Sequence, residues 1–110
     1  MNTETKTKSK QWSAAENAAC VSAYLKMVEL QNAGKPYSKA KIRRELIGTQ
    51  TNPGTLYARS EGSIEFKFMN VSACMRAIGR IEVTGYKPAM NYQSDLMREV
   101  CAQTHHNATA

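Results

Sequence analysis

The strongest constraint on the fold is a run of apolar residues at helical spacing near the middle of the chain. Between Ser60 and Gly79, apolar side chains recur every three or four positions, at Ile64, Phe68, Val71, Met75 and Ile78. This spacing places them on one face of an α-helix, which Ser60 or Ser63 can cap and Gly79 can end. Other apolar residues project from the opposite side: Phe66, Met69, Ala73 and Ala77. We therefore expect the chain that follows to cover part of that second face.

Three further segments have helical signals. Ser13 and Glu16 match a capping box and begin an apolar pattern that runs to Asn32, ahead of Gly34. Ser38 can cap a short basic helix over residues 39–47, and a four-residue apolar spacing predicts a last helix over residues 91–104. Residues 81–90 are expected to form a short extended or irregular connection. The predicted fold is all-α, a bundle of three to four helices with a helix-turn-helix-like core.

Length and composition favour one domain. The chain has 110 residues, of which 42% are hydrophobic and 22% charged, a mix typical of a globular protein. We expect a flexible basic tail over residues 1–11, a single helical domain over residues 12–104, and a disordered tail over residues 105–110. No apolar run is long enough to span a bilayer and no signal peptide is evident, so a cytoplasmic location is expected.

The cysteines and histidines do not form a metal-binding pattern. Cys20, Cys74 and Cys101 are far apart and odd in number, which favours reduced, buried thiols over disulfides or a zinc site. His105 and His106 are adjacent in a polar tail with no third ligand nearby. No cofactor and no metal are predicted.

The positive charge is concentrated in the first part of the chain. Up to Arg44 there are nine lysines and arginines against three glutamates, whereas the rest of the chain is balanced, so this part accounts for the net charge of +6. Nucleic acid is the simplest polyanion for such a surface, because neutralised phosphates release counterions.

Several blocks of the sequence together resemble a known family. They include Trp12-Ser13-x-x-Glu16-Asn17, Gly34-Lys35-Pro36-Tyr37-Ser38-Lys39-Ala40, Arg59-Ser60-x-Gly62-Ser63-Ile64-Glu65-Phe66-Lys67-x-x-Asn70-Val71-Ser72-Ala73 and Gly85-Tyr86-Lys87-Pro88-Ala89-x-Asn91-Tyr92-Gln93. Over about residues 12–96 the chain is similar to the N-terminal helical head domain of McrA-like, modification-dependent HNH restriction endonucleases. It also resembles, more loosely, the three-helix Myb/SANT arrangement.

The resemblance implies a role without catalysis. The family carries its nuclease histidines and metal ligands in a separate C-terminal domain, so no catalytic residue carries over. It implies a stand-alone module that binds DNA or joins a nuclease, acting in or against DNA restriction and phage defence as a regulator, accessory subunit or antagonist. The Myb/SANT likeness implies that the helix after Ser60 reads bases.

The first functional hypothesis is nucleic-acid binding, most simply to double-stranded DNA. Candidate contacts to phosphates or base edges lie in two segments, residues 39–44 and residues 59–76: Lys39, Lys41, Arg43, Arg44, Arg59, Ser60, Ser63, Lys67, Asn70 and Arg76. Lysines of the N-terminal tail would add phosphate contacts. The candidates also have structural alternatives: Ser63 can simply cap a helix, Asn70 can satisfy a loop backbone, and Arg59 can pair with Glu61 or Glu65.

The second hypothesis is a protein-interaction or dimerisation module. The helix over residues 14–32 has a second apolar row, at Ala19, Ala23, Met27 and Leu30, and the chain has six methionines, which suit adaptable contacts. An enzyme is the weakest alternative, since the sequence has no Gly-rich phosphate loop, paired-carboxylate box or nucleophile–base pattern.

Overall fold

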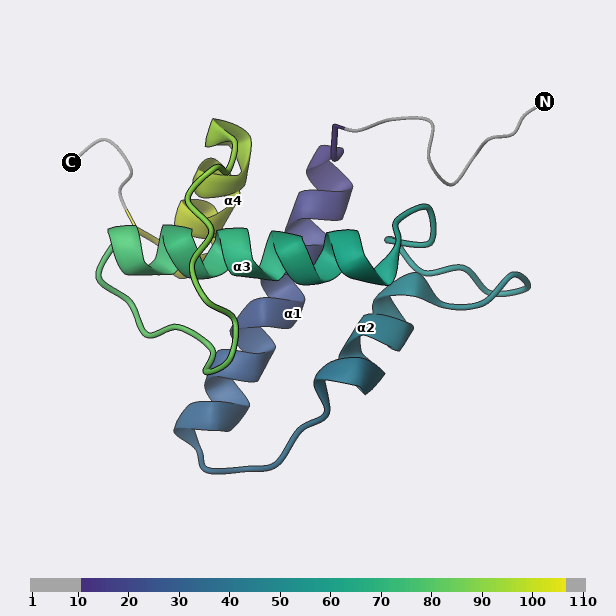
Figure 1. Ribbon diagram of the computed structural model, residues 1–110, viewed down its shortest axis with the longest axis horizontal. Coiled ribbons are helices and arrows are strands. Elements are labelled where there is room, and N and C mark those ends of the chain that lie inside the picture. The colour runs from purple at the N-terminus through teal and green to yellow at the C-terminus, as the bar shows by residue number, and fades with distance from the viewer. Residues whose placement is uncertain (1–10, 107–110) are drawn as a thin grey trace.

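The computed structural model describes residues 11–106, which fold into four packed helices. They are α1 (Ala14–Asn32), α2 (Lys39–Ile47), α3 (Glu61–Ala77) and α4 (Ser94–Thr104). The all-α class predicted from the sequence is confirmed, and the described residues contain no strand. Helix α3 lies across α1, with α2 and α4 near its opposite ends (Figure 1). The predictions for residues 1–10 and 107–110 fall outside the described part of the chain.

Three of the helices begin at the serines that the sequence predicts as caps. Ser13 and Glu16 form a complete capping box on α1, Ser38 accepts a hydrogen bond from the Lys41 amide, and Ser60 accepts one from the Ser63 amide. Helix α4 differs from its prediction, because it starts at Ser94 rather than Asn91. The residues before it are held away from helical geometry, and Gln93 has an extended backbone.

The core lies where α1, α3 and α4 meet. On α3, Ile64, Phe68, Val71 and Met75 of the predicted stripe are buried, and so is Ala73 on the other face. Phe66, by contrast, is 43% exposed. Helix α3 is therefore a central helix of the fold rather than one with a single covered face.

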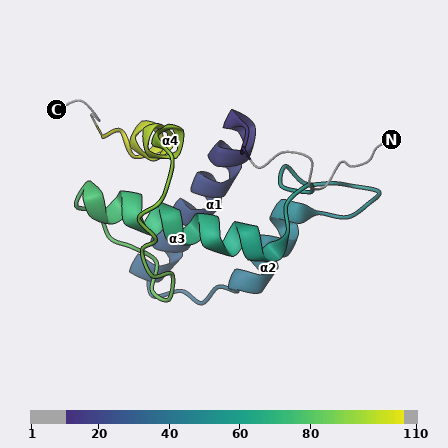
Figure 2. The ribbon, with the colours of Figure 1, turned by 45° about the horizontal axis from the view of Figure 1, so that its top comes forward.

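The segment between α3 and α4 covers part of the second face of α3, as expected, while Phe66 and Ala77 of that face stay exposed. It leaves the end of α3, turns, and runs back across α3 to α4 (Figures 1 and 2). Val83 and Tyr86 of this segment are buried in the core. The Ala89 amide donates to the Met69 carbonyl at 3.0 Å, which joins the returning chain to the helix.

Helix α2 lies outside this core, since none of its residues is buried. Residues 48–60 connect it to α3, a longer connection than the three or four residues of a helix-turn-helix. The loop is not only superficial, because Leu56 is fully buried in the core. The turn residues Asn52, Pro53 and Gly54 predict a surface loop over residues 49–57, and nothing in that pattern indicates that Leu56 is buried.

The three cysteines are free and buried, as predicted. None of the described helices combines the length and the apolar character that crossing a membrane requires.

Candidate nucleic-acid interface

Three of the four arginines predicted to meet nucleic acid, Arg43, Arg59 and Arg76, form ion pairs within the domain. Arg59 pairs with Glu16 at 2.7 Å, with both side chains nearly buried, and Arg43 pairs with Glu65 at 2.5 Å. Arg76 pairs with Glu82 at 2.6 Å, although its own side chain stays 65% exposed. The positive charges of Arg43, Arg59 and Arg76 are therefore already partly neutralised by glutamates of the domain.

Arg59 belongs to a cluster around Trp12. The Arg59 guanidinium lies 5.1 Å from the centre of the Trp12 ring and the Lys67 ammonium 4.7 Å from it, so two cations contact one indole. Hydrogen bonding to Arg59 lowers the pKa of Glu16 despite its burial. Burial lowers the pKa of Lys67. This cluster attaches the start of α1 to the start of α3.

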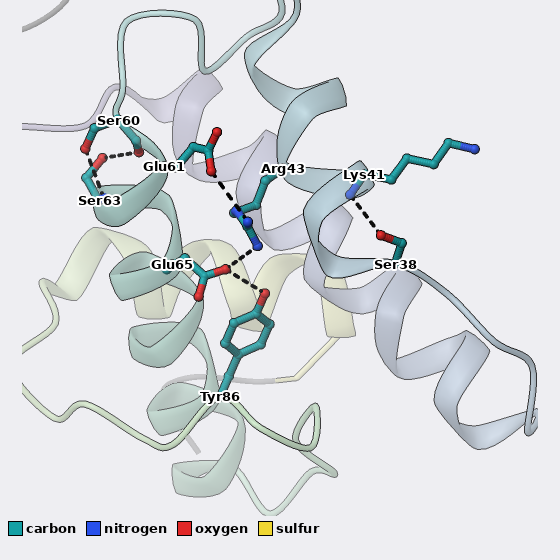
Figure 3. A network of polar contacts seen from close by, with 8 residues as sticks. All are labelled: Ser38, Lys41, Arg43, Ser60, Glu61, Ser63, Glu65 and Tyr86. Atoms are coloured by element: carbon teal, nitrogen blue, oxygen red, sulfur yellow. Dashed lines mark hydrogen bonds and ion pairs between the residues drawn. The ribbon is translucent and has the colours of Figure 1, made fainter.

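Arg43 forms a second polar cluster between α2 and α3, drawn in Figure 3. Its guanidinium reaches Glu65 and, at 3.5 Å, Glu61, while the Tyr86 hydroxyl donates to the same Glu65 carboxylate at 3.2 Å. Burial, followed by the neighbouring Glu65 charge, raises the pKa of Tyr86 to about 12. Within residues 11–106, the Arg43 Nε atom is buried without a hydrogen-bond partner. Arg43 therefore connects α2 to the core instead of facing solvent.

The polar candidates at the start of α3 have local structural roles. Ser60 caps the helix, and the Ser63 hydroxyl donates to the Ser60 carbonyl at 2.9 Å. Asn70 is 2% exposed and its Nδ2 donates to the Ala89 carbonyl at 2.7 Å. The Asn70 contact matches the structural alternative weighed for that residue. Ser63 does not act as the cap, because Ser60 caps the helix, and the glutamate that pairs with Arg59 is Glu16 of α1.

The two lysines of α2 differ in whether their ammonium groups contact the rest of the domain. The Lys39 ammonium donates to the Thr84 carbonyl at 2.7 Å and lies 4.5 Å from the centre of the Tyr86 ring. Lys41 and Arg44 are exposed, and within residues 11–106 neither side chain has an ion-pair or hydrogen-bond partner. Figure 3 shows Lys41 pointing away from the body of the domain. Of the candidate residues, these two are therefore the most available to a polyanion.

A groove between α1 and α2 was not predicted as a site. Two adjoining hollows of about 210 and 270 Å³ share Lys26, Ile42 and Glu45. The remaining lining is mostly apolar and comes from both helices and the chain between them: Ala23, Leu30, Tyr37, Ser38, Lys41 and Leu46. The second apolar row of α1 was the sequence signal for it, because Ala23 and Leu30 belong to that row.

No group of three or more histidine, cysteine or acidic side chains is placed to hold a metal ion in the described residues. Comparisons with protein-family models, with curated proteins and with solved structures found no match.

Proposed function

We propose that this chain is a non-catalytic interaction module that binds an acidic, amphipathic helix of a partner protein in the groove between α1 and α2. The observation that carries the proposal is an apolar groove that remains open beside a helix with no buried residue. Helix-in-groove binding uses such a surface, with apolar anchors spaced by one helical turn.

The attachment of α2 supports this proposal. Its apolar residues Ile42 and Leu46 are only partly buried against the core, while Arg43 and Lys39 fix the helix through polar contacts. An apolar surface held open in this way can accept a partner without unfolding the domain.

The charge around the groove favours an acidic occupant. Lys26 and Lys41 line it, and Lys26, which is 62% exposed, forms an exposed ion pair with Glu29. Among the residues that the structure describes, Glu45 is the single acidic one in the lining. A second copy of this chain, with a net charge of +6, would be repelled where an acidic helix is attracted.

The family resemblance adds a biological setting to the proposal. If the chain corresponds to a restriction-endonuclease head domain, the partner is a nuclease that the module assists or antagonises. Its role in DNA restriction or defence would then depend on docking and require no catalytic residue of its own.

Charge reversal at the rim tests the groove. The probe is a synthetic amphipathic helix with leucines at helical spacing and glutamates elsewhere, followed by NMR titration. We expect saturable shifts at Ala23, Leu30 and Ile42, and about five- to tenfold weaker binding in the Lys26→Glu/Lys41→Glu variant. Lys87→Glu, an exposed lysine outside the groove, is the single-charge control. Shifts outside the groove, or the same loss in the control, would contradict the proposal.

A second candidate function is contact with nucleic-acid phosphates through Lys41 and Arg44. It rests on their exposure and on the lack of a partner for either side chain among the described residues. Two phosphate contacts give a slope of about −1.8 in a plot of log affinity against log salt concentration. A role for α3 in base reading has less support, because Asn70 and the start of the helix are engaged inside the domain.

Arg44 separates the two candidates, since it does not line the groove. Arg44→Glu should weaken binding to plain and cytosine-methylated duplexes in fluorescence anisotropy and leave peptide binding unchanged. Arg98→Glu, an exposed arginine on α4, is the matched control. No binding to either duplex at low salt would remove this second candidate.

A further inference from the structure

We propose that the groove between α1 and α2 selects an acidic helix that carries one basic side chain, and that Glu45 recognises that side chain. The inference rests on the proposed function, because it names the charge pattern of the helix that the groove accepts. Glu45 lies on α2 and lines both hollows of the groove. An occupant of either hollow is therefore within reach of this residue.

The charge of Glu45 is left unpaired. Its side chain is exposed, and within residues 11–106 it forms neither an ion pair nor a hydrogen bond. The other glutamates of the described domain each contact a partner: Glu16, Glu29, Glu61, Glu65, Glu82 and Glu99. Of the glutamates that the structure describes, Glu45 is thus the one whose carboxylate is available to a ligand.

The two lysines of the groove do not neutralise Glu45. Lys41 precedes it by four residues on α2, a spacing that places both on one face of the helix, about 6 Å apart along the axis. Lys26, which lines both hollows from α1, pairs with Glu29 instead. The groove therefore presents positive and negative charge at separate places, and a matching occupant supplies both signs.

An entirely acidic helix does not match this pattern. Such a helix places a carboxylate beside Glu45, and like charges brought together at an interface oppose binding. A lysine or arginine at that point replaces the repulsion with an exposed ion pair, which adds modestly to the affinity. Glu45 therefore acts mainly on the choice between acidic helices, while the apolar lining and the lysines attract all of them.

The direction of the groove sets the spacing of the two signs. One hollow reaches Ser38 and Lys41 near the start of α2, and the other reaches Leu46 near its end, so the groove follows the helix. A helix lying in it can set residues four positions apart against Lys41 and Glu45. The selected helix thus has an acidic and a basic residue separated by about one turn.

Single-lysine peptides test the inference by NMR titration of the full chain. The reference probe is the leucine–glutamate helix used to test the groove, and each variant peptide has one glutamate beside the leucines replaced by lysine. We expect a lysine at one of these positions to tighten binding about three- to fivefold, although the peptide loses negative charge. A lysine on the face opposite the leucines is the control and should not tighten binding.

One substitution in the domain shows whether Glu45 is responsible. The gain from the lysine should disappear in Glu45→Gln and persist in Asp95→Asn, which removes one negative charge on α4, outside the groove lining. Because the same peptides are titrated into both proteins, differences in their own helicity cancel.

The outcomes separate this inference from the proposed function. Binding in the groove with no preference for a lysine, or a preference that survives Glu45→Gln, would overturn the role of Glu45 and leave the groove as a docking site. Failure of every peptide to bind would overturn the proposed function and this inference with it.

Discussion

At the scale of single residues, ion pairs attach the helices to one another. Glu16 lies on α1, and Arg59 directly precedes Ser60, the N-cap residue of α3, so their ion pair joins the two helices. The Glu16 and Arg59 side chains are only 12% and 11% exposed. A pair with so little access to water depends on both partners, because removing one leaves the other charge unpaired. Arg59 also donates to the Gln11 carbonyl at 2.8 Å, which holds the chain ahead of α1.

Replacing Arg59 should therefore destabilise the fold strongly. We expect Arg59→Met to lower the free energy of unfolding by about 3 kcal/mol, since Glu16 stays buried without its partner. Lys26→Met is the matched control, because the pair of Lys26 with Glu29 is exposed and should contribute under about 1 kcal/mol. Urea unfolding of both variants measures the difference, and similar losses would show that the Arg59 pair is not the stronger one.

The same pair predicts a dependence of stability on pH. The pKa of Glu16 is lower in the folded chain than its ordinary value of 4.5, chiefly because Arg59 hydrogen-bonds the carboxylate. The ionised Glu16 carboxylate therefore contributes to folding stability above pH 4.5, and this contribution is lost as the pH falls through the pKa of the folded chain. In urea unfolding, the Glu16→Gln variant should lose less stability than the parent protein as the pH falls from about 5 to 3. The profile of Glu29→Gln should follow the parent protein; a parent-like profile for Glu16→Gln would refute the assignment.

At the scale of elements, the end of α2 depends on close contact between backbones. Gly48 ends the helix with a φ of 73°, and the Gly54 amide donates to the Ile47 carbonyl at 2.8 Å. A Cβ atom at Gly54 would lie 2.2 Å from the Leu46 carbonyl oxygen. The returning loop can thus reach the helix only because no side chain intervenes.

Two glycine substitutions should have opposite effects. Gly54→Ala should destabilise the domain by about 1–3 kcal/mol, because the new methyl group overlaps the Leu46 backbone. Gly62→Ala, in the first turn of α3, meets nothing within 4 Å and should stabilise the domain by up to about 1 kcal/mol. Thermal unfolding measures both changes, and equal melting temperatures would contradict the close approach of loop and helix.

At the scale of the whole molecule, Tyr24 joins three parts of the chain. Its hydroxyl oxygen on α1 accepts from the Val83 amide at 2.8 Å and lies 2.6 Å from the Ser72 hydroxyl on α3. Its ring lies near Phe68, with 6.2 Å between ring centres. One buried side chain therefore connects α1, α3 and the segment that covers α3.

Tyr24→Phe should lower the free energy of unfolding by about 1–3 kcal/mol, although the ring and its packing remain. The reason is that the buried Val83 amide and Ser72 hydroxyl lose their shared partner. The control is Tyr37→Phe, at a half-buried tyrosine of the groove, which should change stability by less than about 0.5 kcal/mol. Denaturant unfolding measures the free energy of unfolding of both variants. Equal stability of the two would argue against the role of the Tyr24 hydroxyl.

The sequence by itself determined the helices, because their signals are local. Apolar spacing and capping serines act within a few residues, so the ends of α1 and α2 agree with the prediction. The late start of α4 and the burial of Leu56 were missed, since both depend on how the connecting segments pack against distant helices.

Only the tertiary structure decided which charged residues remain available. Arg59 pairs with a glutamate 43 positions away, and Arg43 with one 22 positions away, so spacing along the chain does not reveal either partner. The open groove likewise exists only because of how α1 meets α2. Local hydrogen bonding sets where a helix begins and ends, whereas the choice of ionic partners and exposed surfaces follows from which helices come together.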